Sequence, residues 1–288
     1  TAATPTATEI PTETVTATPT DTATPTATAT TEALLCNPSG GAGGLEPGTH
    51  DVMLAGHPAT IIVGDAYTST TPTFLAYYLH GDEGGYDIHA NTENVVNQFI
   101  RTNGWVYVAP QAPALSAGYY PWTSNGIPSP GADANLQEIV DVLEDMFAHY
   151  NVCRNVLFGG SHSGGSWFYD AYVFPNKGGE YPSYFNLNCG AAGVTGDGFW
   201  TDTGLYQKLQ ALSADPDILA RAEFKFSAGD ADFLYPYAVT SSGTLTDLGF
   251  MVSTDFFPGV DHCGYDISTS VRDYWQQKSS SLTLPDKP

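Results

Sequence analysis

Basic residues are scarce in this chain of 288 residues. Nine Lys and Arg stand against 31 Asp and Glu, the formal net charge is −22, and the first basic residue is Arg101. A nucleic-acid-binding protein needs a basic surface to neutralise phosphates, and an anionic membrane surface would repel so acidic a chain. The composition therefore excludes nucleic acid and anionic membranes as partners.

Long apolar runs and paired cysteine motifs are also missing. No stretch approaches the ~20 consecutive apolar residues that span a bilayer. The four cysteines, Cys36, Cys153, Cys189 and Cys263, include no C-x-x-C pair, which argues against zinc and thioredoxin-like chemistry. Their even number favours two disulfides and an extracellular protein, and four buried free thiols are the alternative. Of the three possible pairings we expect Cys153–Cys189 and Cys36–Cys263.

Apolar periodicity is absent from the first 35 residues. Fifteen of the first 31 are Thr, interspersed with Ala and Pro. Such a segment cannot bury enough surface to offset the entropy of ordering it, and Thr-Pro repeats favour extended conformations. We expect residues 1–35 to form a disordered spacer to an upstream anchor or binding module. Residues 36–288, about 250 in number, suit one domain, which carries 27 acidic and nine basic residues.

Within residues 36–288, apolar runs alternate with amphipathic segments. A helix is predicted after Asp133, where apolar residues recur on one helical face, and another over 268–278. Runs rich in β-branched and aromatic residues predict strands at 58–64, 73–80, 105–110, 156–158, 223–229 and 250–259. The alternation predicts an α/β fold with a mostly parallel central sheet and helices on both faces. Chemistry in such sheets collects at the carboxyl ends of the strands.

Residues 156–165 predict a strand, a tight turn of small residues and a helix, the pattern of a nucleophile elbow. Two registers fit. Ser161 has Gly159 two residues before it and Ser163 two residues after it, whereas Ser163 has Ser161 before it and Gly165 after it. We favour Ser161, because the strand 156–158 then meets the turn directly and Pro175 follows fourteen residues later. Ser163 is the alternative, because its surroundings match the common H-S-x-G turn.

Two further loops each follow a predicted strand. Asp232 lies after 223–229, with Asp230 as a competitor, and His262 lies after 250–259. A carboxylate in such a position can hold the tautomer and orientation of a histidine. The set Ser161, Asp232 and His262 therefore predicts a catalytic triad.

A fourth loop, LHGDEGG, follows the strand 73–80. A His-Gly turn there can supply one backbone N–H to an oxyanion, and such donors are worth roughly 10²–10³ in rate each. We assign this role to the N–H groups of Asp82 and of His162, the residue after Ser161. A metal-binding acidic loop is the alternative for this segment.

These stretches carry a family resemblance. The chain resembles the α/β-hydrolase esterases related to extracellular poly(hydroxybutyrate) depolymerases and feruloyl or acetylxylan esterases. The similar stretches cover most of residues 45–280 and read YYLHGDEGG, WVYVAPQAP, NVLFGGSHSGG, SAGDADFLYP and FFPGVDHCG. In some tannases and fungal feruloyl esterases of this kind, cysteines beside the catalytic Ser and His are bonded to each other. Here Cys263 follows His262 but no Cys precedes either serine, so that variant is not matched.

The resemblance implies an α/β-hydrolase fold and a two-step acyl transfer. In it Ser161 is the nucleophile, His262 takes its proton and Asp232 orients the imidazole. No metal or organic cofactor takes part.

Only the aromatic residues of one loop and the net charge of the chain indicate the class of substrate. Tyr119, Tyr120 and Trp122 could line a cleft and stack on an aromatic or sugar ring, or could simply pack within their loop. The negative charge disfavours polyanions and favours neutral polyesters or acylated xylan. The sequence thus predicts a secreted serine carboxylesterase acting on polymeric or wall-bound esters. A serine peptidase or acyltransferase of the same fold and a non-catalytic surface binding domain are the alternatives.

Overall fold

The computed structural model describes residues 36–82, 87–113, 121–122, 131–193, 203–282 and 284. All of them belong to one compact unit, Ala33–Pro288. The expected spacer, residues 1–35, lies outside the described residues.

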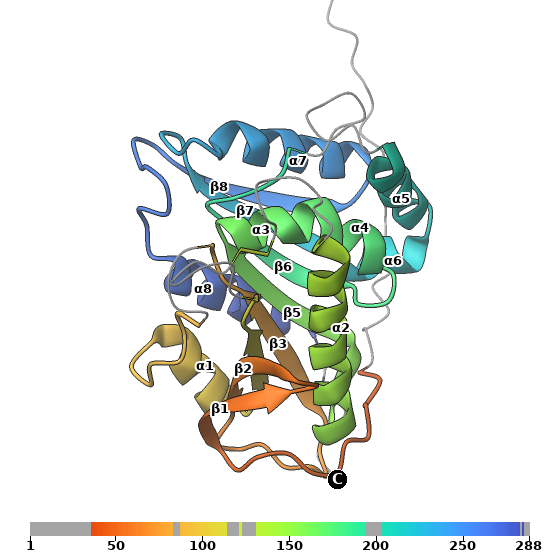
Figure 1. The fold of residues 1–288 in the computed structure, drawn as a ribbon, viewed down its shortest axis with the longest axis vertical. Helices are drawn as coiled ribbons and strands as arrows, with labels where there is room; N and C mark the ends of the chain where they lie inside the picture. The colour runs from red at the N-terminus through yellow and green to blue at the C-terminus, as the bar shows by residue number, and fades with distance from the viewer. Residues whose placement is uncertain are drawn as a thin grey trace, which may run out of the picture. The chain divides into compact units, whose positions relative to one another are not determined.

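The described chain is organised around one eight-stranded sheet with the spatial order β1-β2-β4-β3-β5-β6-β7-β8 (Figure 1). Strands β3 to β8 run parallel to one another, whereas β2 is antiparallel to both of its neighbours, β1 and β4. The strands are β1 (Gly48–Leu54), β2 (His57–Val63), β3 (Thr73–Leu79), β4 (Val106–Pro110), β5 (Val152–His162), β6 (Ser183–Asn188), β7 (Glu223–Gly229) and β8 (Met251–Phe257).

Helices cover both faces of this sheet. One face carries α1 (Val95–Asn103) and α8 (Ile267–Ser279), which pack side by side (Figure 1). The other face carries α2 (Ala132–His149), α3 (Gly164–Phe168), the π-helix η2 (Tyr169–Val173), α4 (Phe174–Lys177), α5 (Thr203–Ser213), α6 (Pro216–Arg221) and α7 (Tyr235–Asp247). The predicted α/β architecture is confirmed, with a helix near the C-terminus and a long helix that begins at Ala132, so that Asp133 lies in its first turn rather than before it. In the part of the chain that is described, no helix is both long and apolar enough to cross a membrane.

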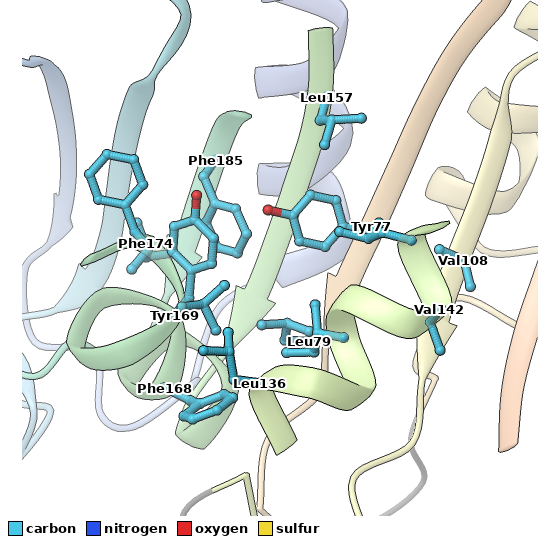
Figure 2. Close-up of a cluster of buried hydrophobic side chains, with 14 of the residues drawn as sticks. Tyr77, Leu79, Val108, Leu136, Val142, Leu157, Phe168, Tyr169, Phe174 and Phe185 are labelled. Atoms are coloured by element: carbon cyan, nitrogen blue, oxygen red, sulfur yellow. The ribbon is translucent and has the colours of Figure 1, made fainter. Parts of the chain in front are cut away.

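Strand β3 shows why the sheet is buried on both sides. All seven of its residues are buried, and they alternate between two hydrophobic clusters. Tyr77 and Leu79 share the cluster of Leu136 from α2 and Phe168 from α3 (Figure 2), whereas Tyr78 points into the cluster beneath α1 and α8. A strand covered on both faces needs a continuous apolar run, which is what the sequence offered.

Two strands, β1 and β6, were not predicted. Strand β6 reads SYFNLN, and its polar positions concealed it. Asn186 and Asn188 are fully buried, but their amides donate to Ser270 Oγ at 3.1 Å and to the Ser161 carbonyl at 3.0 Å. Because hydrogen bonds satisfy these amides, two asparagines are tolerated in the centre of the sheet.

Strand β5 is longer than predicted and reaches His162. Its last residues pair with β3 on one side and β6 on the other, and Ser161 stands opposite both Leu79 and Leu187. Gly159 lies within this strand, and it must be a glycine because a Cβ there would overlap the Phe185 ring on β6. The glycine pair therefore serves packing inside the sheet, and the turn begins two residues later than we favoured.

The disulfides join Cys36 to Cys153 and Cys189 to Cys263, so the expected pairings are wrong. Cys153 lies near the amino end of β5, whereas Cys189 follows the carboxyl end of β6. These strands are parallel neighbours, so one cysteine lies where the strands begin and the other where they end. They are too far apart for a bond that needs Cα atoms within about 7 Å.

Candidate active site

The turn between β5 and α3 contains Ser163. Its backbone has φ 47° and ψ −119°, in the left-handed half of the Ramachandran map that residues other than glycine rarely adopt. Gly165 follows at a point where a Cβ would overlap the carbonyl oxygens of Leu79 and His80. The small residues thus let the helix approach β3 while the strained turn carries Ser163 beyond the end of the sheet.

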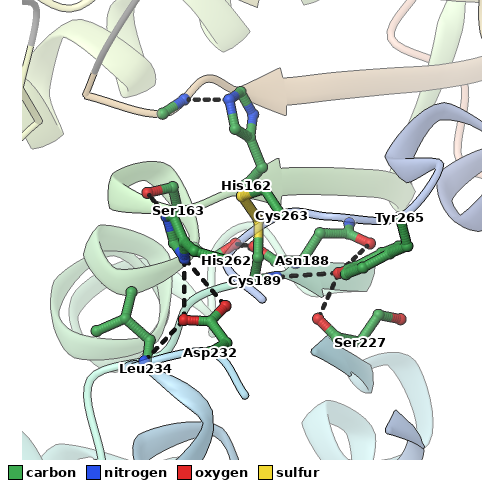
Figure 3. The surroundings of a disulfide bond; sticks show 12 residues. His162, Ser163, Asn188, Cys189, Ser227, Asp232, Leu234, His262, Cys263 and Tyr265 are labelled. Carbon is green, nitrogen blue, oxygen red and sulfur yellow. Dashed lines mark hydrogen bonds and ion pairs between the residues drawn. A yellow bond between two sulfur atoms is a disulfide. The ribbon is translucent and has the colours of Figure 1, made fainter. Parts of the chain in front are cut away.

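Ser163 begins a chain of hydrogen bonds through two other loops (Figure 3). Its Oγ lies 3.0 Å from His262 Nε2, and His262 Nδ1 lies 2.9 Å from both carboxylate oxygens of Asp232. Asp232 is buried, and its Oδ1 also accepts from the Leu234 N–H at 2.8 Å. A carboxylate at Nδ1 fixes the hydrogen there and leaves Nε2 to accept the serine proton. The arrangement can therefore deprotonate Ser163.

Ser161, the serine we favoured, does not take part in this arrangement. It is fully buried within β5, and its Oγ lies 2.8 Å from Ser166 Oγ. The geometry therefore favours the alternative register, in which Ser163 is the serine that meets His262. The competing acid, Asp230, instead accepts the Gly259 N–H at 2.7 Å and stabilises a neighbouring turn.

The loop after β3 reaches the same place. Asp82 lies against the serine turn so closely that a Cβ on Gly164 would overlap its carboxylate. With Ser163 in the turn, the residue after the serine is Gly164, whereas the expected donor His162 is the residue after Ser161. His162 is still among the residues that line the cavity.

Neither a family model nor a curated protein matches the sequence, but solved structures do match the fold. An S-formylglutathione hydrolase from Agrobacterium tumefaciens has a TM-score of 0.55 at 14% identity, over 82% of this chain and 94% of its own. A ferulic acid esterase gives 0.54 at 14% identity, over 80% of this chain and 93% of its own. A lidless α/β serine hydrolase from Xanthomonas campestris gives 0.51 at 15% identity, over 85% and 99%. The chain has the α/β-hydrolase fold.

In this fold, the topology explains how distant residues meet. Ser163, Asp232 and His262 follow the carboxyl ends of β5, β7 and β8. Those strands are parallel, so their carboxyl ends open at the same edge of the sheet.

Of the three aromatic residues that we expected in the cleft, the described one, Trp122, does not line it. Trp122 is fully buried, its Nε1–H donates to the His80 carbonyl at 3.0 Å, and its ring stacks on Phe168. The prediction for Trp122 is wrong, because a satisfied indole N–H lets the ring serve as core. Tyr119 and Tyr120 lie outside the described residues.

A different aromatic residue borders the site. Phe233 is 69% exposed, and its ring centroid lies 4.6 Å from that of His262. The sequence signal for it was its position directly after Asp232. The cavity here measures about 450 Å³ and is lined by Gly81, Asp82, His162, Ser163, Phe233, His262 and Cys263.

One group of side chains in the described ranges has metal-ligand spacing, namely Cys189, His262 and Cys263. The two sulfurs are bonded to each other, whereas metals bind cysteine as the thiolate. The acidic-loop alternative rests partly on Glu83, which falls outside the described residues.

Proposed function

We propose that this chain is a serine carboxylesterase. The observation that carries the proposal is the continuous hydrogen-bond chain from Ser163 through His262 to Asp232, with the serine in a strained turn. Esters are also the substrates that the names of a similar ferulic acid esterase and a similar carboxylesterase indicate for those proteins.

In the proposed reaction, Ser163 Oγ attacks the ester carbonyl while His262 Nε2 takes its proton. Asp232 stabilises the imidazolium that forms, and the same proton then passes to the leaving alcohol. Water, deprotonated by His262, releases the acid from the acyl-enzyme. The backbone N–H groups of Asp82 and Gly164 hold the oxyanion in both steps.

A fluorophosphonate reagent tests this proposal. We expect one label per chain, located on Ser163 by peptide mass spectrometry, and loss of p-nitrophenyl butyrate hydrolysis in parallel with labelling. Unlabelled native protein would contradict the proposal and favour a non-catalytic binding domain. Labelling of Ser163 with turnover of peptides but not esters would instead favour a peptidase.

We further propose that the ester is uncharged and belongs to a polymer, either a polyester or acylated xylan. No charged residue occurs from Phe233 to Thr246, a segment that includes most of α7. Pro236 and Val239 are exposed on that helix, so an uncharged surface adjoins the cavity in a protein of net charge −22. Such a surface accepts a neutral chain and offers nothing to an anionic one.

We propose that the enzyme acts outside the cell, with residues 1–35 as a linker to an anchor or binding module. Two disulfides support this location, because such bonds persist in oxidising compartments. A Thr/Pro-rich composition supports a linker.

Phe233→Ala should lower kcat/KM for methyl ferulate roughly tenfold, corresponding to ~1.4 kcal/mol of lost apolar contact. The value for p-nitrophenyl acetate should change little, because its acyl group is too short to reach the ring. Val239→Ala, an exposed apolar residue farther along α7, is the matched control. Equal losses on both esters would show that Phe233 acts by placing His262 instead.

A further inference from the structure

Gly81 is held by an imidazole at each of its backbone polar groups. Its N–H donates to His162 Nε2 at 3.1 Å, and its carbonyl oxygen lies 2.6 Å from His80 Nδ1. A Cβ on this residue would lie 2.7 Å from His162 Nε2. Glycine is therefore required for the ring to approach the backbone so closely.

Both imidazoles are neutral. Burial lowers the pKa of His162 to about 3 and the pKa of His80 to about 4. Neither ring is protonated near neutral pH, so each has one nitrogen that donates and one that accepts.

The hydrogen bonds fix the same tautomer in both rings. His162 Nε2 accepts from Gly81, so Nδ1 carries the hydrogen and donates to the Tyr78 hydroxyl at 2.9 Å. His80 Nε2 accepts from the Ala112 N–H at 3.0 Å, so Nδ1 carries the hydrogen and donates to the Gly81 carbonyl. Each ring therefore connects Gly81 to a partner elsewhere in the fold.

The Gly81 carbonyl and the Asp82 N–H belong to one peptide group. In a planar trans peptide these two groups point in opposite directions. Because His80 holds the carbonyl on the buried side, the Asp82 N–H is directed away from His80. Gly81, Asp82 and Ser163 line the cavity together, so the peptide group that His80 holds borders the site.

We propose that His162 and His80 are positioning residues that hold the Asp82 N–H as an oxyanion donor at a fixed place relative to Ser163. His162 has the more direct effect, because it is joined by a peptide bond to Ser163 and by a hydrogen bond to Gly81. It makes the serine turn and the donor loop move as one body. This inference rests on the proposed esterase function.

The test compares His162→Asn with His162→Gln. The Asn side chain is too short to reach the Gly81 N–H, whereas the Gln carbonyl oxygen can occupy the place of Nε2. We expect His162→Asn to lower kcat for an oxoester by about 10²-fold with little change in KM, the effect of losing one oxyanion donor. His162→Gln should restore most of that loss.

A thionoester, in which sulfur replaces the carbonyl oxygen of the same ester, distinguishes a displaced oxyanion donor from general damage to the active site. An N–H donor stabilises a developing O⁻ much more than a developing S⁻, so the wild-type enzyme should prefer the oxoester strongly. His162→Asn should shrink this preference about as much as it lowers kcat. The proposal would be overturned if His162→Asn lowered kcat equally for the two esters, so that its preference for the oxoester stayed as large as in the wild-type enzyme.

Tyr78→Phe is a second variant that removes a single oxygen. Without that acceptor, the His162 hydrogen is free to move from Nδ1 to Nε2, where it opposes the Gly81 N–H. The oxoester preference should again shrink, and an unchanged preference would count against the proposal even if His162→Asn failed to fold. Ser163→Ala, measured in parallel, distinguishes the two proposals, because near-wild-type esterase activity in that variant would contradict the proposed function rather than the positioning role.

Discussion

Ser163→Ala is expected to lower kcat for ester hydrolysis by about 10⁴- to 10⁶-fold, the range seen when a triad nucleophile is removed. The reason is geometric, since Ser163 is the serine whose Oγ lies within hydrogen-bond distance of His262 Nε2. Steady-state kinetics with p-nitrophenyl butyrate, together with circular dichroism to verify folding, make the measurement.

Ser161→Ala is the matched control for that experiment. The same atom is removed two residues earlier, from a buried position where Oγ contacts Ser166. We expect near-wild-type kcat and a stability loss of about 1 kcal/mol, the usual net value of one hydrogen bond. An inactive Ser161→Ala beside an active Ser163→Ala would return the nucleophile to the register first favoured from the sequence.

Removing the Cys189–Cys263 disulfide should impair both stability and catalysis. The bond closes a loop across 74 positions in sequence, for which chain entropy predicts roughly 4–5 kcal/mol of stabilisation. Both cysteines have left-handed backbones, at φ 40° and φ 55°, that are unfavourable for residues other than glycine. Without the bond, nothing forces Cys263 to keep that conformation, so the adjacent His262 should move away from Ser163.

The other disulfide provides the comparison. Cys36–Cys153 spans 117 positions, so its removal should cost about as much unfolding free energy, again roughly 4–5 kcal/mol. Cys36–Cys153 lies near the amino end of β5, whereas Ser163 follows the carboxyl end of that strand. Because this disulfide is remote from the site, its removal should leave kcat unchanged. Urea unfolding and kcat of the two double Cys→Ala variants make the test. Equal activity in both would refute a role of Cys189–Cys263 in placing His262.

The features that sequence predicted well are those encoded locally. The fold followed from apolar runs alternating with amphipathic ones, and the loops of Asp232 and His262 were found because each directly follows such a run. The structure brings both residues to one edge of the sheet because parallel strands must end together.

The features that sequence did not predict depend on contacts between distant segments. Position 159 is a glycine because Phe185 packs on it from β6. Nothing near Gly159 in the sequence indicates that ring, so the glycine was interpreted as part of the turn. Trp122 is a core residue because a carbonyl of the β3 loop accepts its indole N–H. The disulfide pairing depends on which edge of the sheet each cysteine occupies, and Gly81 meets His162 across 81 positions.

The Cys36–Cys153 disulfide also determines how the domain bears tension. Residues 37–39 run beside the start of β5, where Arg154 N–H donates to the Asn37 carbonyl and Ser39 N–H donates to the Val152 carbonyl. A pull on the chain ahead of Cys36 therefore passes through a covalent bond into β5, a central strand that β3 and β6 flank. Without that bond, only the hydrogen bonds of residues 37–39 would stand between the pull and β1, the strand at the edge of the sheet. With it, the load enters a strand that is hydrogen-bonded on both sides, and the edge strand β1 is bypassed.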